Sequence, residues 1–165
     1  MSKLALGTVQ FGLNYGIANQ SGQTEFSDAA NILQLAKEAK IDLIDTAIAY
    51  GNSEKILGKI GVTDFNLISK LPSVPKNCQN IDNWVTGMIQ GSLERLKIRS
   101  LYGLMIHQSQ NLLDNSGKKL VDALYRIKSI GLVKKIGVSI YNPSEIDDVI
   151  NLMKIDIVQA PLNVI

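Results

Sequence analysis

Residues 41–70 read IDLIDTAIAYGNSEKILGKIGVTDFNLISK, and the order of short patterns in this stretch decides the fold. Two short apolar runs, 41–45 and 66–70, have the length and composition of buried strands, and each ends at a charged side chain. Between them, Asn52 or Ser53 can cap a short helix. The apolar positions of that helix follow helical spacing: Ile56, Leu57 and Ile60. The stretch therefore predicts a strand, a helix and a second strand.

The same alternation runs through the whole chain. Further strands are predicted at 4–6, 101–107, 135–139 and 155–160. Further helices are predicted from apolar residues at three-four spacing, in four groups: Ala29, Ile32, Leu33, Ala36 and Ala39 after a cap at Ser27; Ile81, Trp84, Val85, Met88, Ile89, Leu93 and Leu96; Leu120, Leu124, Ile127 and Ile130, ended by Gly131; and Ile146, Val149, Ile150 and Met153 after the capping sequence Asn142-Pro143-Ser144-Glu145. Six strands that alternate with helices predict an α/β fold with a parallel sheet covered by helices. The pattern alone leaves a (β/α)8 barrel and an open doubly wound sheet as alternatives.

Composition argues against several classes of protein. A net charge of +2, from 17 basic and 15 acidic residues scattered along the chain, gives no field that favours nucleic acid or an anionic membrane as partner. No apolar run approaches the roughly 20 residues that span a bilayer. Cys78 is the only cysteine, so an internal disulfide cannot form and a reducing, cytoplasmic location is expected. One histidine and one cysteine without clustered carboxylates leave a zinc site short of ligands, so no metal is expected.

Four ionisable side chains lie where predicted strands end. Asp45, Lys70 and His107 close the second, third and fourth strands, and Tyr50 follows the second. The carboxyl ends of barrel strands meet at one mouth, so side chains far apart in the sequence can converge there. Each residue alone has a structural interpretation: a satisfied histidine, a loop tyrosine, a helix-capping aspartate or a solvated lysine. Their shared position at strand ends favours a catalytic site.

The chemistry of this set suits the reduction of an aldehyde or ketone. A tyrosine with an ordinary pKa of about 10 protonates a substrate efficiently at neutral pH only when its phenolate is stabilised, and Lys70 is the expected cation beside Tyr50. Asp45 would keep Lys70 charged and oriented, and His107 could direct a carbonyl oxygen. Because no side chain donates a hydride of this kind, a bound cofactor is required. The competing interpretation is another barrel enzyme, a sugar isomerase or an aldolase, in which Lys70 acts as a base or forms a Schiff base.

The segment Asp45-Thr46-Ala47-Ile48-Ala49-Tyr50-Gly51-Asn52-Ser53-Glu54 resembles the second-strand signature of the aldo-keto reductases. Four shorter motifs agree with that family in order and spacing: Leu6-Gly7-Thr8, Ser69-Lys70, Ile106-His107 and Gly137-Val138-Ser139. The resemblance implies a TIM-type (β/α)8 barrel. It also implies that Tyr50 is the general acid, tuned by Lys70 and Asp45. By the same resemblance, His107 orients the carbonyl.

The resemblance further implies that NADPH, with NADH as the alternative, supplies the hydride. Its nicotinamide end would contact five residues: Gly7, Thr8, Asp45, Ser139 and Gln159. Many family members have an asparagine at the position of Ile140, and isoleucine cannot make that hydrogen bond to the carboxamide. The loss of one buried hydrogen bond, about 0.5 to 1.5 kcal/mol, would weaken the site without abolishing it.

The chain differs from the family pattern in length. Barrels of this type have eight strand-helix units and usually about 250 residues, whereas these 165 residues supply six strands. We therefore expect residues 1–165 to form a single aldo-keto reductase-like domain that lacks the last two units, with exposed edges on its first and last strands. Self-association, a partner chain or the remainder of a longer reading frame would cover these edges.

Two functions follow from this reading. The leading hypothesis is an oxidoreductase that needs the missing units for full activity. The alternative is a catalytically silent barrel that senses a cofactor or binds another protein. The substrate is expected to be a small carbonyl compound, and the asparagine, glutamine and tyrosine content of loop 11–24 favours a sugar-like one.

Overall fold

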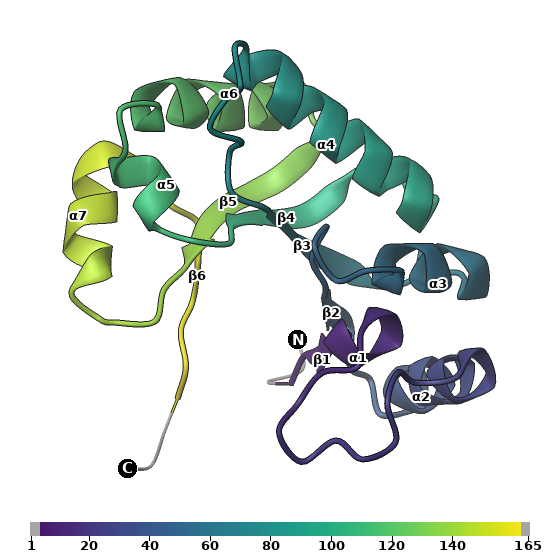
Figure 1. Cartoon of the computed structure of the whole chain (residues 1–165). Coiled ribbons are helices and arrows are strands. Elements are labelled where there is room, and N and C mark those ends of the chain that lie inside the picture. The colour runs from purple at the N-terminus through teal and green to yellow at the C-terminus, as the bar shows by residue number, and fades with distance from the viewer. Residues whose placement is uncertain (1–3, 163–165) are drawn as a thin grey trace.

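Six parallel strands form one curved sheet in the computed structural model, which describes residues 4–162. The strands are β1 (Leu6–Gly7), β2 (Leu43–Asp45), β3 (Asn66–Leu71), β4 (Leu101–Ile106), β5 (Val133–Ser139) and β6 (Ile157–Gln159). Each pairs with the next one along the chain, and every pair is parallel. This order has no reversal, so it is the order of a barrel and not of a doubly wound sheet. The sheet curls into a half-barrel with β1 and β6 on the two sides of its opening (Figure 1).

The predicted domain boundaries at residues 1 and 165 lie outside the described residues.

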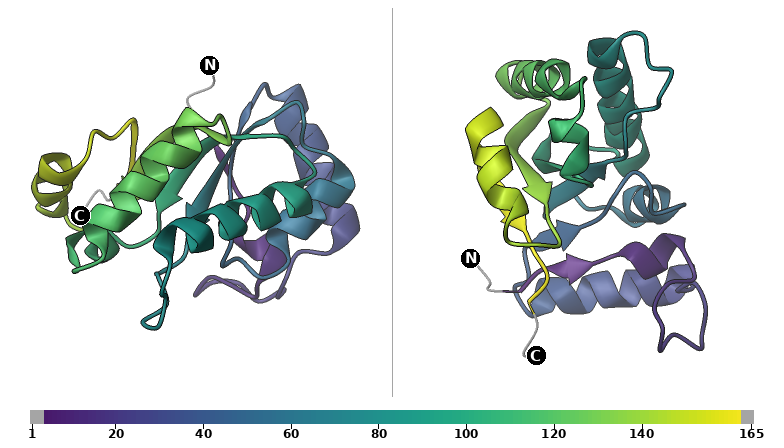
Figure 2. Two further views of the ribbon diagram at one scale, coloured as in Figure 1. Left: turned by 90° about the horizontal axis from the view of Figure 1, so that it is seen from above. Right: turned by 60° about the vertical axis from the view of Figure 1, so that its left-hand side comes forward.

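Helices cover the convex side of the sheet (Figures 1 and 2). The longer ones are α2 (Phe26–Glu38), α3 (Ser53–Ile60), α4 (Ile81–Leu96), α6 (Gly117–Ser129) and α7 (Glu145–Leu152). Two single-turn helices, α1 (Val9–Gly12) and α5 (Gln110–Leu113), follow the carboxyl ends of β1 and β4. The predicted parallel sheet covered by helices is therefore confirmed, and this sheet curls into a half-barrel.

The main hydrophobic core lies between the sheet and these helices. Side chains from α3, α4 and α6 pack there against alternate residues of β3, β4 and β5. The fully buried members include Leu57, Val85, Ile89, Leu96, Leu124, Ile127, Leu67, Leu71, Leu104, Ile106, Ile136 and Val138. Trp84 and Met88 pack against this core while partly buried, which confirms their predicted structural role. The residues between these positions on the strands face the concave side, where Gly103 lets Ile68 and Ile157 approach one another.

The ends of several elements differ from the prediction. The first strand is two residues later than expected, and α2 begins at Phe26 after Glu25, so Ser27 lies inside the helix and is no cap. The single turns α1 and α5 carry too few apolar residues to show a helical period. Ile130 and Ile150, predicted to be buried, are more than half exposed because each lies at the outer side of its helix end.

The predicted start of α7 uses the expected chemistry in a shifted position. Glu145 accepts hydrogen bonds from the backbone N–H groups of Tyr141 and Asn142, at 3.0 and 2.6 Å. This is the reach-back of a capping box, although regular helix geometry begins only at Glu145. A hydrogen bond from Ser109 to the same carboxylate joins the loops after β4 and β5.

Two helix glycines should respond to alanine in opposite directions. A Cβ on Gly58 of α3 would lie 2.0 Å from the carbonyl oxygen of Arg95 on α4, so we expect Gly58→Ala to lower the free energy of unfolding by about 1 to 3 kcal/mol. Gly87 of α4 is exposed with open space around it. Gly87→Ala should therefore raise the free energy of unfolding by about 0.5 to 1 kcal/mol. Urea unfolding of both variants measures this, and equal effects would contradict the close packing of α3 on α4.

Candidate active site

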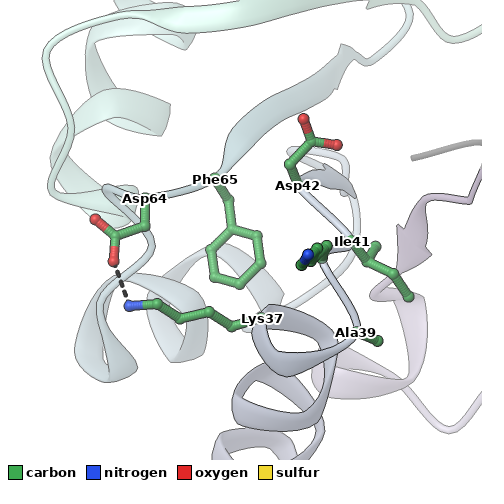
Figure 3. Close-up of a pocket in the computed structure, with 7 residues that line it drawn as sticks. Lys37, Ala39, Ile41, Asp42, Asp64 and Phe65 are labelled. Carbon is green, nitrogen blue, oxygen red and sulfur yellow. Dashed lines mark hydrogen bonds and ion pairs between the residues drawn. The ribbon is translucent and has the colours of Figure 1, made fainter. Parts of the chain in front are cut away.

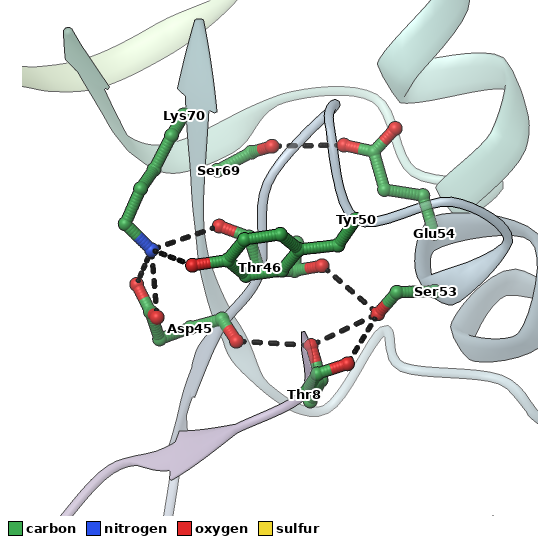
Figure 4. A network of polar contacts seen from close by, with 8 residues as sticks. All are labelled: Thr8, Asp45, Thr46, Tyr50, Ser53, Glu54, Ser69 and Lys70. Atoms are coloured by element: carbon green, nitrogen blue, oxygen red, sulfur yellow. Dashed lines mark hydrogen bonds and ion pairs between the residues drawn. The ribbon is translucent and has the colours of Figure 1, made fainter. Parts of the chain in front are cut away.

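The four residues predicted from strand ends come together at one edge of the sheet, and Figure 4 shows three of them, Asp45, Tyr50 and Lys70. Lys70, near the end of β3, donates from Nζ to both carboxylate oxygens of Asp45, at 2.6 and 2.7 Å. The same Nζ lies 3.2 Å from the carbonyl oxygen of Thr46 and 3.4 Å from the hydroxyl of Tyr50. Parallel strands place their carboxyl ends side by side, so β2 and β3 supply the ion pair directly.

His107 completes the group from β4. Its backbone N–H donates to the carbonyl oxygen of Leu71 at 3.1 Å, which fixes the residue just beyond the β3–β4 pair. Its ring meets the ring of Tyr50 edge to face, with centroids 5.9 Å apart and planes at 78°. All four side chains line one cavity of about 270 Å³, together with Ser139, Ile140, Tyr141, Gln159, Ala160 and Pro161.

The ammonium group of Lys70 is almost fully buried, with 3% of its side chain exposed. Burial lowers the pKa of Lys70 from its usual value, and the neighbouring carboxylate of Asp45 opposes that shift. A lysine that forms a Schiff base needs to be neutral and away from a carboxylate. The bidentate ion pair is the reverse of that arrangement, which argues against the aldolase interpretation.

The pKa of Tyr50 moves in the direction opposite to the sequence-based expectation. Burial and the negative charge of Asp45 raise the pKa of Tyr50 to about 12. Burial is the larger cause, and the Lys70 ammonium does not reverse it because the Asp45 oxygens, which lie closer to that ammonium than the phenol does, offset its positive charge. Tyr50 therefore holds its proton at neutral pH and is a weak acid in this structure.

His107 is held in its neutral form. Burial lowers the pKa of His107 below its usual value, and the positive charge of Lys70 acts in the same direction. A neutral imidazole carries one N–H group and one acceptor nitrogen. It can therefore donate a hydrogen bond to an oxygen in the cavity without adding a charge.

The backbone around Tyr50 is fixed by close packing. A Cβ on Gly12 of α1 would lie 1.7 Å from the carbonyl oxygen of Tyr50, and one on Gly51 would lie 2.4 Å from the carbonyl oxygen of Gly12. Gly51 also has a φ of +54°, which favours glycine. The Ser53 N–H then donates to the carbonyl oxygen of Tyr50 at 3.0 Å. The segment 46–52, which we call the acid loop because it carries the predicted acid Tyr50, thus packs directly on α1, the turn after β1.

The structure divides the predicted nicotinamide contacts into two groups. Asp45, Ser139 and Gln159 line the cavity, and Ser139 pairs with Gln159 in the β5–β6 register. Among residues 4–162, the side chains of Ser139 and Gln159 make no hydrogen bond, so their polar atoms are available to a ligand. Gly7 and Thr8 do not line the cavity. The Thr8 hydroxyl is buried and donates to the carbonyl oxygen of Asp45 at 2.9 Å.

Two tyrosines near the cavity were missed from the sequence. Tyr141 lines the cavity two residues after Ser139, and both Tyr141 and Tyr15 lie near enough to Tyr50 for their charged forms to raise its pKa. Tyr141 obeys the same strand-end rule that identified His107, so the position after β5 was a usable signal. Tyr15 lies inside a long loop, where no period or strand end marks it.

A neighbouring depression of about 290 Å³ adjoins the cavity. The two share His107 and Tyr141, and the depression is otherwise lined by Ala49, Pro72, Ser73 and Gln108. The Ser73 hydroxyl donates to the side-chain carbonyl of Gln108 at 2.8 Å, which gives one wall a polar surface. A ligand at His107 could therefore extend past Tyr141 into a second small space.

A larger depression, about 590 Å³, lies at the other end of the sheet (Figure 3). It is formed where α2 ends and where β2 and β3 begin, and Lys37 and Asp64 make an exposed ion pair at 2.6 Å on its wall. No charged side chain in its lining is buried. Its residues are solvated surface groups, so we assign no chemistry to it.

Residues 4–162 contain neither a cluster of metal-ligating side chains nor a membrane-spanning helix. No group of three or more histidine, cysteine, aspartate or glutamate side chains there could hold a metal ion. Within the same residues, none of the helices combines the length and the apolar character needed to cross a bilayer.

Comparisons with known proteins agree on one family. The model of the aldo/keto reductase family matches residues 3–165. A curated aldo-keto reductase from Mycolicibacterium vanbaalenii is 31% identical over 139 residues, which cover 79% of this chain and 47% of that protein. This chain therefore spans about half the length of the curated relative that it matches.

Solved structures show the same fold. An aldo-keto reductase from Pseudomonas aeruginosa superposes with a TM-score of 0.82 at 28% identity, over 99% of this chain and 64% of that one. The holo form of an aldo-keto reductase from Bacillus halodurans gives a TM-score of 0.79 at 19% identity, over 98% and 54%. In each case the described strands correspond to part of a longer barrel.

The Lys70–Asp45 ion pair should couple the two residues energetically, so that removing both costs less stability than the sum of the two single losses. Lys70→Met leaves the Asp45 carboxylate without its cation, so we expect the free energy of unfolding to fall by about 3 kcal/mol or more. The double variant Asp45→Asn/Lys70→Met removes both charges and should recover a substantial part of that loss. Urea unfolding of the wild type, Asp45→Asn, Lys70→Met and the double variant measures this, and strictly additive effects would contradict the pairing.

The single histidine should leave a signature in the pH dependence of stability. The pKa of His107 is lowered on folding, so the unfolded chain binds the proton more readily. Its contribution to stability is present above the unfolded pKa of about 6.5 and is lost as the pH falls through the folded pKa. We therefore expect wild type to lose more stability than His107→Gln between pH 7.5 and 5.5, measured by urea unfolding at each pH. Equal slopes would contradict the assignment.

Proposed function

The chain belongs to the aldo-keto reductase family, and on that premise we propose that it reduces an aldehyde or ketone with NADPH, with Tyr50 as the general acid. The observation that carries this proposal is the group around Lys70. Its Nζ lies 2.6 Å from Asp45 and 3.4 Å from the Tyr50 hydroxyl, and His107 lines the same cavity. Family membership supports oxidoreductase chemistry at this site.

The proton step follows from the protonation states. NADPH supplies a hydride to the carbonyl carbon when it is bound. Neutral His107 donates an N–H group to the carbonyl oxygen and fixes its direction toward Tyr50. Tyr50, with its pKa raised to about 12, arrives at the reaction protonated. An alkoxide is a stronger base than a phenolate, so the proton transfer from Tyr50 to the substrate oxygen is still favourable.

Lys70 and Asp45 act on the phenolate that remains. Once Tyr50 has lost its proton, the Lys70 ammonium at 3.4 Å becomes the nearest positive charge to the phenolate oxygen. Asp45 keeps that ammonium charged against its burial. Within the pair, the ammonium stabilises the phenolate and the Asp45 carboxylate opposes it, so Tyr50 stays protonated until the substrate oxygen becomes basic.

The cavity has suitable groups for a nicotinamide. Ser139 offers a hydroxyl and Gln159 an amide, and both are free of hydrogen bonds within residues 4–162. These groups match the donor and acceptor of a carboxamide. Asp45 would contact the adjoining ribose, and Ile140 provides an apolar wall where it cannot provide a hydrogen bond. The Thr8 hydroxyl already donates to the carbonyl oxygen of Asp45, so we do not propose that it contacts the cofactor. Gly7 could contribute only backbone groups.

We propose a small polar carbonyl compound, sugar-like in its hydroxyl content, as the substrate. The support is the depression beside His107, whose wall carries the Ser73–Gln108 hydrogen bond at 2.8 Å. Its volume of about 290 Å³ is at the low end for ligand sites, so the substrate is small. Tyr141 would cover one face of the substrate.

Two polar side chains of loop 11–24, the predicted substrate contact, are already used within the protein. Asn19 donates to the carbonyl oxygens of Tyr15 and Gly22, and Gln23 donates to that of Phe11 at 2.8 Å. These side chains hold the loop in its own shape, and sequence composition could not distinguish that role from substrate contact. Tyr15 is the residue of this loop that lies near Tyr50.

The open edges of the half-barrel favour a second role for the same chain. Within residues 4–162, β1 pairs only with β2 and β6 only with β5, so each has an unpaired edge. We propose that residues 1–165 act as one domain and that two further strand-helix units, on the same or another chain, or a second copy, complete the barrel. The alternative function, a silent cofactor-sensing or protein-binding module, rests on these edges alone. A cytoplasmic location stays a prediction from the single cysteine.

The decisive experiment is a pair of measurements on Tyr50→Phe. This change removes the proton and leaves the nicotinamide contacts intact. We expect carbonyl reduction to fall by at least about 100-fold, in keeping with the usual contribution of general acids. Binding of NADPH, followed by the fluorescence of the cofactor with NADH as the comparison, should change less than about twofold. A Tyr125→Phe variant serves as the control, because Tyr125 does not line the cavity and its hydroxyl only accepts a hydrogen bond from the Lys154 N–H.

The outcomes separate the two functions. Turnover near the wild-type level in Tyr50→Phe would overturn the assignment of the acid. Saturable NADPH binding by the wild-type chain without turnover of small aldehydes would favour the sensing module. A folded chain that binds neither cofactor would leave only the interaction role.

A further inference from the structure

Glu54 is a buried carboxylate that lies outside the active-site cavity. It stands in the first turn of α3, is 2% exposed, and accepts hydrogen bonds from Ser69 at 2.8 Å and Ser92 at 2.6 Å. Arg95 of α4 donates to its second oxygen at 2.8 Å. One carboxylate therefore joins the start of α3, strand β3 and helix α4. No step of the proposed reaction uses it.

The Ser69 contact reaches the site through one peptide. Ser69 and Lys70 are neighbours on β3, and successive side chains of a strand point to opposite faces. Glu54 thus holds the helix-facing side of β3 immediately behind the residue whose ammonium meets Asp45 and Tyr50 (Figure 4). Displacement of Ser69 would displace Lys70 with it.

The Tyr50 side of the site is tied to the same turn. Ser53 donates its backbone N–H to the carbonyl oxygen of Tyr50 at 3.0 Å. Its hydroxyl lies 2.9 Å from the carbonyl oxygen of Thr8 and 3.1 Å from the hydroxyl of Thr46. The first turn of α3 therefore holds the acid loop through Ser53 and strand β3 through Glu54 (Figure 4).

The buried charge of Glu54 restricts how far its hydrogen-bond partners can move. A buried carboxylate is tolerated only when its oxygens are paired and hydrogen-bonded, and charge-assisted bonds are shorter and stronger than neutral ones. Here both oxygens have partners on elements other than α3. The position of α3 relative to β3 is thus set by a charge that has no alternative solvation.

We propose that Glu54 is a positioning residue for the active site, which sets the separation between the Tyr50 hydroxyl and the Lys70–Asp45 pair by fixing α3 against Ser69 of β3. The kinetic part of this inference rests on the proposed function, and the structural part does not. Loss of the Glu54 charge should let the Tyr50 loop move outward, away from Lys70 and toward water.

The test follows the ionisation of Tyr50 in Glu54→Gln. Wild type and variant carry 13C at the tyrosine ζ position, and the Tyr50 signal is identified from Tyr50→Phe. Burial and Asp45 raise the pKa of Tyr50 to about 12 in the wild type, so its signal should stay that of a phenol up to pH 11. In Glu54→Gln both influences weaken, and we expect the pKa to fall by at least one unit toward the ordinary value of about 10. Circular dichroism at each pH confirms that the chain is folded.

Two further variants separate positioning from general stability. Ser69→Ala removes the link to β3 and keeps the Arg95 ion pair, so it should lower the Tyr50 pKa in the same direction; it also serves if Glu54→Gln does not fold. Asp82→Asn is the matched control, because it breaks the other ion pair of α4, Asp82 with Arg126 at 2.5 Å, on the side away from α3. It should lower the melting temperature and leave the Tyr50 titration unchanged.

Kinetics supplies the second readout. If the wild type reduces carbonyls, Glu54→Gln should lower kcat at least tenfold and change the KM for NADPH less than twofold. Unchanged Tyr50 titrations in both Glu54→Gln and Ser69→Ala, or an equal shift in Asp82→Asn, would overturn the inference. A wild-type chain without turnover would count against the proposed function alone, because the Tyr50 titration still decides the role of Glu54.

Discussion

A buried ammonium group is the constraint on which the carboxyl edge of this sheet depends. The Lys70 charge is far from water, so the fold must bring it a carboxylate, and Asp45 at the end of the neighbouring strand does so at 2.6 Å. Burial lowers the pKa of His107 and raises that of Tyr50, and the charges of this pair add to both shifts, Lys70 to the first and Asp45 to the second. The protonation states of the site therefore follow from desolvation together with one ion pair.

The sequence predicted the architecture because alternation is a local property. Short apolar runs between amphipathic helices are visible without coordinates, and residues at the ends of parallel strands must share an edge. Asp45, Tyr50, Lys70 and His107 could be collected on that ground. The direction of the Tyr50 pKa could not, because it depends on how deeply the phenol is buried and on the carboxylate that offsets the Lys70 charge.

Other features escaped prediction for similar reasons. Thr8 carries a family motif, yet its hydroxyl faces the interior and holds the strand end in place. Glu54 belongs to the same motif as Tyr50, and only its burial and its partners reveal what it holds. Motifs identify positions that matter, whereas contacts decide whether a side chain acts on a ligand or on the fold.

Gly12 packs closely against Tyr50, at the point where loop 13–23 meets the acid loop. Loop 13–23 is closed at its base by the hydrogen bond from the Thr24 N–H to the carbonyl oxygen of Gln10, at 2.9 Å, and is braced internally by Asn19 and Gln23. Near its root, Gly12 and the Leu13 side chain lie against Gly51, and Tyr15 lies near Tyr50. The outer part of the loop, residues 16–23, can therefore vary in length and sequence while Tyr50 keeps its place. Under the proposed function, substrate selectivity could then change through this loop without moving the proton donor.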